Sequence, residues 1–123
     1  MANILLIDDD AMLREMFKQG LEKYGHRVSL AADGDAGLAA QKSTAIDLVI
    51  TDLIMPGKEG IETIMELRRR APRLKIIAMS GGGQGTARNY LELAGKLGAN
   101  RTLTKPFAFP ELSATIAEVL QED

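Results

Sequence analysis

The sequence predicts a three-layer α/β sandwich, in which helices cover both faces of a five-stranded parallel sheet. Short β-branched or leucine-rich runs alternate five times with longer stretches of helical period, the pattern of repeated strand–helix units. Several short runs are apolar at consecutive positions, as expected for strands buried on both faces. A chain of 123 residues has the length of one domain, so a single domain over residues 1–123 is predicted.

The predicted strands are four to six residues long, and the first, third and fourth have the character of central strands. In chain order they are Asn3–Ile7, Arg27–Ala31, Leu48–Thr51, Lys75–Ser80 and Arg101–Thr104. Local chain breakers such as Pro56-Gly57 and the glycines of Gly81–Gly85 mark loops between the elements.

Apolar residues recur at helical spacing in four of the segments that follow the strands, which predicts four helices. The residues with this spacing are Leu13, Met16, Phe17, Leu21 and Tyr24, then Ile61, Ile64 and Met65, then Leu91, Ala94 and Leu97, then Leu112, Ile116, Val119 and Leu120. A further helix over Gly34–Ser43 has a weaker signal because it is rich in alanine and contains two glycines. Asp10 and Asp33 are suited to cap the helices that follow them.

Charge and residue content exclude several kinds of site. With 15 Lys and Arg against 17 Asp and Glu, the net charge of −2 provides no bulk positive field for nucleic acid or an anionic membrane. The absence of cysteine and the single histidine, His26, exclude thiolate and histidine-rich metal sites, and His26 is interpreted as a loop residue. The basic cluster of Arg68–Arg70, Arg73 and Lys75 is interpreted as a helix C-terminus, where cations complement the dipole. No apolar run approaches the roughly 18 residues of a membrane span, and a cytoplasmic location is predicted.

Polar side chains follow the strands of the predicted sheet at one edge. Asp8 and Asp9 follow the first strand, Asp52 follows the third, Ser80 ends the fourth, and Lys105 follows the fifth. Because the carboxyl ends of parallel strands meet at one edge, these groups are expected to converge. Clustered carboxylates require a neutralising cation, and an all-oxygen ligand set suits Mg²⁺. The sequence therefore predicts a divalent metal site built for phosphoryl transfer to an aspartate.

These residues lie in motifs that resemble the receiver domain of bacterial two-component response regulators, and the resemblance covers essentially the whole chain. The motifs are Ile4–Asp9, Asp52–Gly57 with Gly60, Met79–Gly81, and Lys105–Phe107, in the order that the family has them. The resemblance implies the flavodoxin-like receiver fold, with strand order 2-1-3-4-5, and a cis peptide bond between Lys105 and Pro106.

The resemblance also implies a role for each acidic residue. Asp52 is the phosphoacceptor, and its carboxylate attacks the phosphoryl group. Asp9 and Asp52 bind Mg²⁺ (or Mn²⁺) directly, Asp8 acts mainly through water, and the main-chain carbonyl of Ile54 is a further ligand.

Ser80 and Lys105 are implied to contact the phosphoryl group after transfer, and Lys105 to pair with the acidic site before it. In the family, the side chain at the Ser80 position and an aromatic residue three positions before the lysine move together on phosphorylation. In this chain the residue three positions before Lys105 is Thr102, which is not aromatic. The glycines of Gly81–Gly85 lower the barrier to rearrangement, so we expect switching to move this loop and the helix after it.

The implied partners are a sensor histidine kinase or a histidine phosphotransfer protein and a downstream protein target. A chemotaxis-regulator-like domain without an effector domain is expected to signal through its own surface, as a monomer or a phosphorylation-dependent dimer, and without turnover of a separate substrate. Two alternatives stay open: an aspartyl-phosphate phosphatase or phosphotransferase, and a receiver module taken from a larger regulator. The first alternative usually requires a second acid two residues after the nucleophile, where this chain has Ile54.

Overall fold

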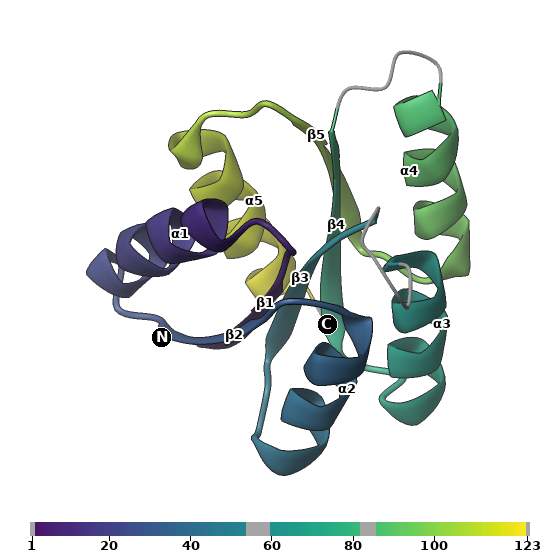
Figure 1. Ribbon diagram of the computed structural model, residues 1–123, viewed down its shortest axis with the longest axis horizontal. Coiled ribbons are helices and arrows are strands. Elements are labelled where there is room, and N and C mark those ends of the chain that lie inside the picture. Colours follow the sequence, from purple (N-terminus) through teal and green to yellow (C-terminus); the bar gives the residue numbers. More distant parts are fainter. Residues whose placement is uncertain (1, 54–59, 82–85, 123) are drawn as a thin grey trace.

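A central sheet lies between two layers of helices in the computed structural model, which describes residues 2–53, 60–81 and 86–122 (Figure 1). The elements alternate along the chain as predicted. They are β1 (Asn3–Ile7), α1 (Ala11–Lys23), β2 (Arg27–Ala31), α2 (Gly34–Ser43), β3 (Leu48–Asp52), α3 (Gly60–Arg70), β4 (Lys75–Gly81), α4 (Thr86–Leu97), β5 (Arg101–Lys105) and α5 (Phe109–Gln121).

All neighbouring strands of the sheet pair in parallel, in the order β2-β1-β3-β4-β5. This confirms the predicted fold class and strand order. Strands β1 and β3 are central and almost fully buried, whereas β5 is an edge strand in which only Leu103 is buried. Three strands continue one residue beyond the predicted end, because Asp52 still pairs with Met79 and Gly81 with Lys105.

Each face of the sheet packs against its own set of helices, which gives the molecule two hydrophobic cores. Helices α2, α3 and α4 cover one face, and α1 and α5 cover the other (Figure 1). On the first face Leu38, Ile64 and Ala94 pack over the sheet, and on the second Leu21 and Ile116 do so. The alternation of strand side chains between these two cores is why the strands are apolar at consecutive positions.

The helix starts follow the predicted capping. The Asp10 side chain accepts a hydrogen bond from the Leu13 amide, and the Asp33 side chain accepts one from the Ala36 amide. His26 lies in the loop before β2, as predicted, where its Nδ1 accepts a hydrogen bond from the Ala2 amide. Within the described ranges, no helix is both long and apolar enough to cross a membrane.

The apolar residues at helical spacing in and just after α1 form a wider stripe than the part that is buried in the core. Phe17 and Leu21 are buried, but Met16 is 60% exposed and Tyr24 is 59% exposed. Tyr24 lies beyond the helix end and stacks on Phe109 with ring centroids 5.7 Å apart. The helical spacing of apolar residues thus locates α1 correctly. Which of these residues are buried depends on where α5 packs against the helix.

A glycine at the start of α3 lets the helix approach the end of β3. A Cβ added to Gly60 would clash with the Asp52 main-chain oxygen and would lie 2.5 Å from the Leu53 Cα. The Gly60 amide donates a hydrogen bond of 3.0 Å to the Leu53 carbonyl at this approach. Substitution Gly60→Ala is therefore expected to lower the free energy of unfolding by roughly 1–3 kcal/mol in urea titrations, because backbone must move.

A second glycine provides the matched control. Gly95 lies within α4, and an added Cβ would meet nothing within 4 Å. Alanine is a better helix former than glycine, so Gly95→Ala should raise the free energy of unfolding by up to about 1 kcal/mol. Equal effects of the two substitutions would contradict the close approach at Gly60.

Candidate functional site

Three carboxylates meet at the carboxyl edge of the sheet, as the sequence predicts. Asp8 follows β1 directly and is fully buried, Asp52 is the last residue of β3 and is 7% exposed, and Asp9 is exposed. One oxygen of each carboxylate lies within 4.8 Å of the others. Burial of two like charges so close together is unfavourable unless a cation accompanies them.

Lys105 provides one such cation at the end of β5. Its Nζ lies 2.8 Å from Asp8 Oδ2 and 3.5 Å from Asp52 Oδ2, and its side chain is 22% exposed. Burial alone would lower the pKa of Lys105, but the hydrogen bond to Asp8 and the charges of Asp52 and Asp8 outweigh it, so the pKa is raised above 10.5. Lys105 is therefore a permanent positive charge at neutral pH.

The turn between β1 and α1 holds the Asp8 side chain in place. The Asp8 amide donates to the Ala31 carbonyl at 3.1 Å, which extends the contact between β1 and β2. The Asp10 amide donates to Asp8 Oδ1 at 3.0 Å, so the residue that caps α1 also binds the buried carboxylate. One carboxylate oxygen of Asp8 thus faces the backbone turn and the other faces Lys105.

Arg14 also contacts this turn, although the sequence analysis did not single it out. Its Nη1 donates a hydrogen bond of 2.6 Å to the Asp8 main-chain oxygen, which fixes the acidic turn to the first part of α1. The signal that could have found it is spacing: Arg14 lies four residues after Asp10 and therefore on the helix face that carries the cap. A second cation thus borders the acidic cluster.

Substitution Arg14→Met should weaken divalent-cation affinity about 3- to 10-fold, because removal of one hydrogen bond costs roughly 0.5–1.5 kcal/mol and loosens the turn. A calorimetric or NMR titration with Mg²⁺ measures this change. Lys18→Met removes the same charge from the same helix, where Lys18 pairs with Glu22, and should leave the affinity unchanged. Equal loss in both variants would contradict a specific role for the Arg14 contact with the Asp8 main chain.

Ser80 places a hydroxyl inside the sheet beside this cluster. It belongs to β4, follows Met79, which pairs with Asp52, and is fully buried. Its Oγ has no hydrogen-bond partner among the described residues. A buried hydroxyl without a partner is costly, and an incoming oxyanion would satisfy it.

Of the other predicted positions, some lie in the described part of the chain and some do not. Thr102 lies on β5 opposite Ala78 and is exposed. The peptide bond between Lys105 and Pro106 is cis, as the resemblance implies. Ile54 and residues 82–85 lie outside the described residues.

The residues present fit a divalent cation. Asp8, Asp9 and Asp52 offer only carboxylate oxygens, which are the ligands that hard cations prefer. Lys105 neutralises part of their charge, and the exposed Asp9 leaves the cluster open to solvent. The edge of the sheet is thus an acidic pocket compatible with a divalent metal.

Comparison with protein-family models decides the family. The model of the response regulator receiver domain matches residues 4–117. The chain belongs to this family. It has the fold and the acidic edge of a receiver domain of two-component response regulators, a signalling module that acts as a phosphoaccepting switch.

Individual relatives agree with this assignment. The chain is 37% identical to the transcriptional regulatory protein CpxR of Klebsiella pneumoniae over 98% of its own length and 50% of the relative. It is similar to a response regulator receiver domain protein of Clostridium thermocellum (32% identity, TM-score 0.89, 98% and 94% of the two chains). It is also similar to the receiver domain of NtrX from Brucella abortus (28% identity, TM-score 0.91, 98% and 99%). The chain thus spans about half the length of CpxR.

Proposed function

We propose that this receiver domain takes a phosphoryl group onto Asp52 from a histidine kinase or a histidine phosphotransfer protein in the cytoplasm. The observation that carries the proposal is the placement of Asp52, a buried carboxylate at the end of a central strand, between Lys105 and two further carboxylates. The unit that switches is the domain over residues 1–123, alone or within a longer regulator. No separate substrate is turned over.

Asp52 attacks as an ionised carboxylate, so the reaction requires no general base. A bond forms between an Asp52 carboxylate oxygen and phosphorus while the bond from phosphorus to the donor imidazole nitrogen breaks, and the imidazole then takes a proton. Phosphoryl transfer depends mainly on positioning and on neutralising charge on the equatorial oxygens. In this chain Lys105 and Ser80 are the groups suited to that neutralisation.

We assign Asp8, Asp9, Asp52 and the Ile54 carbonyl to a Mg²⁺ or Mn²⁺ site. When bound, the ion would neutralise charge on the phosphoryl oxygens and on the carboxylates. The residues themselves orient the acceptor: Asp52 Oδ1 accepts a hydrogen bond of 2.9 Å from the Leu53 amide, and Asp8 holds Lys105 beside it.

Phosphorylation is proposed to be read out by another protein. After transfer, a phosphoryl oxygen would accept a hydrogen bond from the Ser80 hydroxyl, which is buried and has no partner in the described part of the chain. Movement of Ser80 toward Asp52 would pull on β4 and on the segment that leads into α4. New charge at one edge of the sheet would then bias the surface of α4 and β5, which includes the exposed Thr102.

The test is to phosphorylate the protein with Mg²⁺ and a small phosphodonor such as acetyl phosphate. Intact-mass spectrometry should show one added phosphoryl group, and chelation of Mg²⁺ should prevent it. Borohydride reduction converts an aspartyl phosphate to homoserine, and peptide mapping should find homoserine at residue 52. Homoserine at another aspartate, or no uptake at all, would refute the assignment of Asp52.

A further inference from the structure

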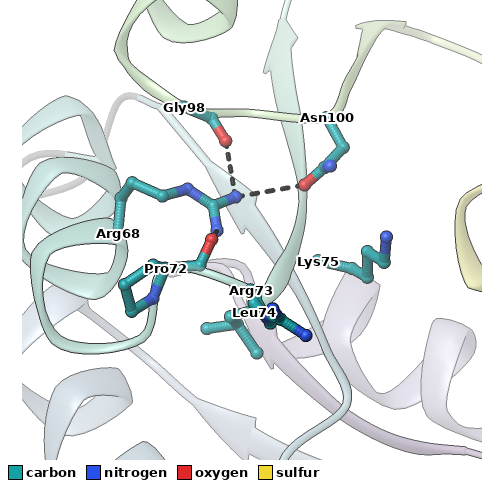
Figure 2. Close-up of a pocket in the computed structure, with 7 residues that line it drawn as sticks. All are labelled: Arg68, Pro72, Arg73, Leu74, Lys75, Gly98 and Asn100. Atoms are coloured by element: carbon teal, nitrogen blue, oxygen red, sulfur yellow. Dashed lines mark hydrogen bonds between the residues drawn. The ribbon is translucent and has the colours of Figure 1, made fainter. Parts of the chain in front are cut away.

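We propose that the chain has a binding site for a polyphosphorylated small molecule at the edge of the sheet opposite the acidic pocket. The site is a hollow of about 510 Å³ lined by Arg68, Pro72, Arg73, Leu74, Lys75, Gly98 and Asn100 (Figure 2). Its walls are the loop before β4 and the loop before β5, which lie at the amino ends of these parallel strands. The volume is that of a small-molecule site.

The Arg68 side chain engages acceptors on three of the residues that line the hollow. Arg68 Nη1 donates to the Ala71 and Pro72 carbonyls, at 3.3 and 2.7 Å. Its Nη2 donates to the Gly98 carbonyl at 2.7 Å and to Asn100 Oδ1 at 3.1 Å, as Figure 2 shows. The Pro72 and Gly98 carbonyls and Asn100 Oδ1 are therefore already engaged within the protein.

The Nη donors of Arg68 are engaged, so the donors that could serve a ligand are those of Asn100, Arg73 and Lys75. Asn100 Oδ1 also accepts from the Ile76 amide at 2.8 Å, so its amide nitrogen is the group left to serve a ligand. Arg73 and Lys75 make no ion pair with any carboxylate of the described residues within 4.0 Å. Figure 2 shows Arg68 and Lys75 on opposite sides of the hollow with Arg73 between them.

The charge of the residues that line the hollow favours an anionic ligand. Three cations line the hollow and no carboxylate does. Arg68 is bound only to carbonyl and amide oxygens, so its charge is not neutralised by an acid, and its burial lowers its pKa. Asp47 lines a neighbouring hollow that shares Arg73, where its Oδ2 accepts a hydrogen bond of 2.8 Å from the Asn3 amide, and it does not line this one.

These features select a ligand rich in oxygen acceptors with two or more negative charges. Adjacent phosphoryl groups meet both requirements, and the hollow is larger than a single phosphate needs. The shared chemistry is a diphosphate group, supplied either by inorganic pyrophosphate or by a nucleoside diphosphate. The interpretation of the basic cluster as a simple helix C-terminus explains Arg69 and Arg70, which pair with Glu66, but not Arg73 and Lys75.

The experiment is an NMR titration of the full chain at low salt without divalent cations, so that the acidic pocket binds no metal–phosphate complex. Pyrophosphate should shift the resonances of the Asn100 side-chain amide, Gly98 and the Arg73–Lys75 backbone. In the variant Arg73→Gln/Lys75→Gln the affinity should fall at least 10-fold. The control Arg27→Gln/Arg69→Gln removes the same charge outside the hollow and should change affinity less than 3-fold.

The remaining arms distinguish the source of the diphosphate. Tighter binding of ADP and UDP than of pyrophosphate would assign a nucleotide, and equal binding would assign the diphosphate group itself. Absence of binding, equal losses in both double variants, or shifts scattered over other surface lysines would overturn the proposal. A short DNA duplex that binds more tightly than pyrophosphate and loses affinity in the same variant would replace it with a nucleic-acid surface.

Discussion

Asp52→Asn is expected to abolish phosphoryl uptake, with a fall in the rate of labelling by acetyl phosphate of roughly 1,000-fold or more. An amide nitrogen or oxygen is not a nucleophile of useful strength toward phosphorus, and the other carboxylates are held in different contacts. Asp8 is bound by the Asp10 amide and by Lys105. The measurement is the time course of intact-mass change in the presence of Mg²⁺.

The fold should survive this substitution, which keeps the result interpretable. Asparagine retains an oxygen that can accept from the Leu53 amide, and Lys105 keeps its contact of 2.8 Å with Asp8. Asp10→Asn is the matched control, since it removes the same charge from the same edge while asparagine still caps α1. Labelling of Asp52→Asn at the rate of the Asp10→Asn control would refute the proposed acceptor.

The fold was predictable because local and tertiary preferences agree along most of this chain. β1 and β2 have the predicted bounds: β1 is an apolar run followed by acidic residues, and in β2 apolar Val28 and Leu30 alternate with polar Arg27 and Ser29. The predicted ends of β3, β4 and β5 fall one residue early. Asp52, Gly81 and Lys105 belong to types that are rare in strands, but the ladder to the neighbouring strand retains them.

The convergence of Asp8, Asp52 and Lys105 was predictable for a topological reason. Parallel strands deliver the residues at their carboxyl ends to one edge whatever lies between them in the chain. Contacts of long side chains follow no such rule. Arg14 reaches back to a main-chain oxygen six residues earlier, and Arg68 joins two loops across 30 residues. Spacing places Arg14 on the helix face of the cap but does not reveal its bond to the Asp8 main-chain oxygen, and no sequence pattern encodes the contact of Arg68 with Gly98.

Lys105→Met should destabilise the protein in the absence of divalent cations, by roughly 2–4 kcal/mol in urea unfolding at neutral pH. Asp8 would stay buried without the cation 2.8 Å from it, and Asp52 would lose the charge at 3.5 Å. Mg²⁺ binds the folded state and should stabilise the variant more than the parent, because it restores neutralisation that Lys105 already supplies to the parent. Lys42→Met, which removes an exposed cation from α2, should have little effect.

The stabilisation of the fold by Lys105 should also depend on pH, and the raised pKa of Lys105 determines the direction of this dependence. The pKa is raised above 10.5 in the folded protein by Asp8 and Asp52 despite burial. The stabilisation is therefore fully present below pH 10.5 and is lost as pH rises through the raised pKa. The difference in unfolding free energy between the parent and Lys105→Met should shrink at strongly alkaline pH, whereas the difference for Lys42→Met should not.

A double-mutant cycle separates the pairing of Lys105 from its packing. If Lys105 stabilises the fold by neutralising Asp8, then Asp8→Asn should rescue part of the loss in Lys105→Met, because the double variant buries neither an unpaired carboxylate nor its partner. A coupling energy of at least about 1 kcal/mol is expected for groups in contact. Additive losses would mean that the lysine stem packs at the end of β5 without compensating the acidic cluster, and Mg²⁺ would then stabilise the parent and the Lys105→Met variant equally.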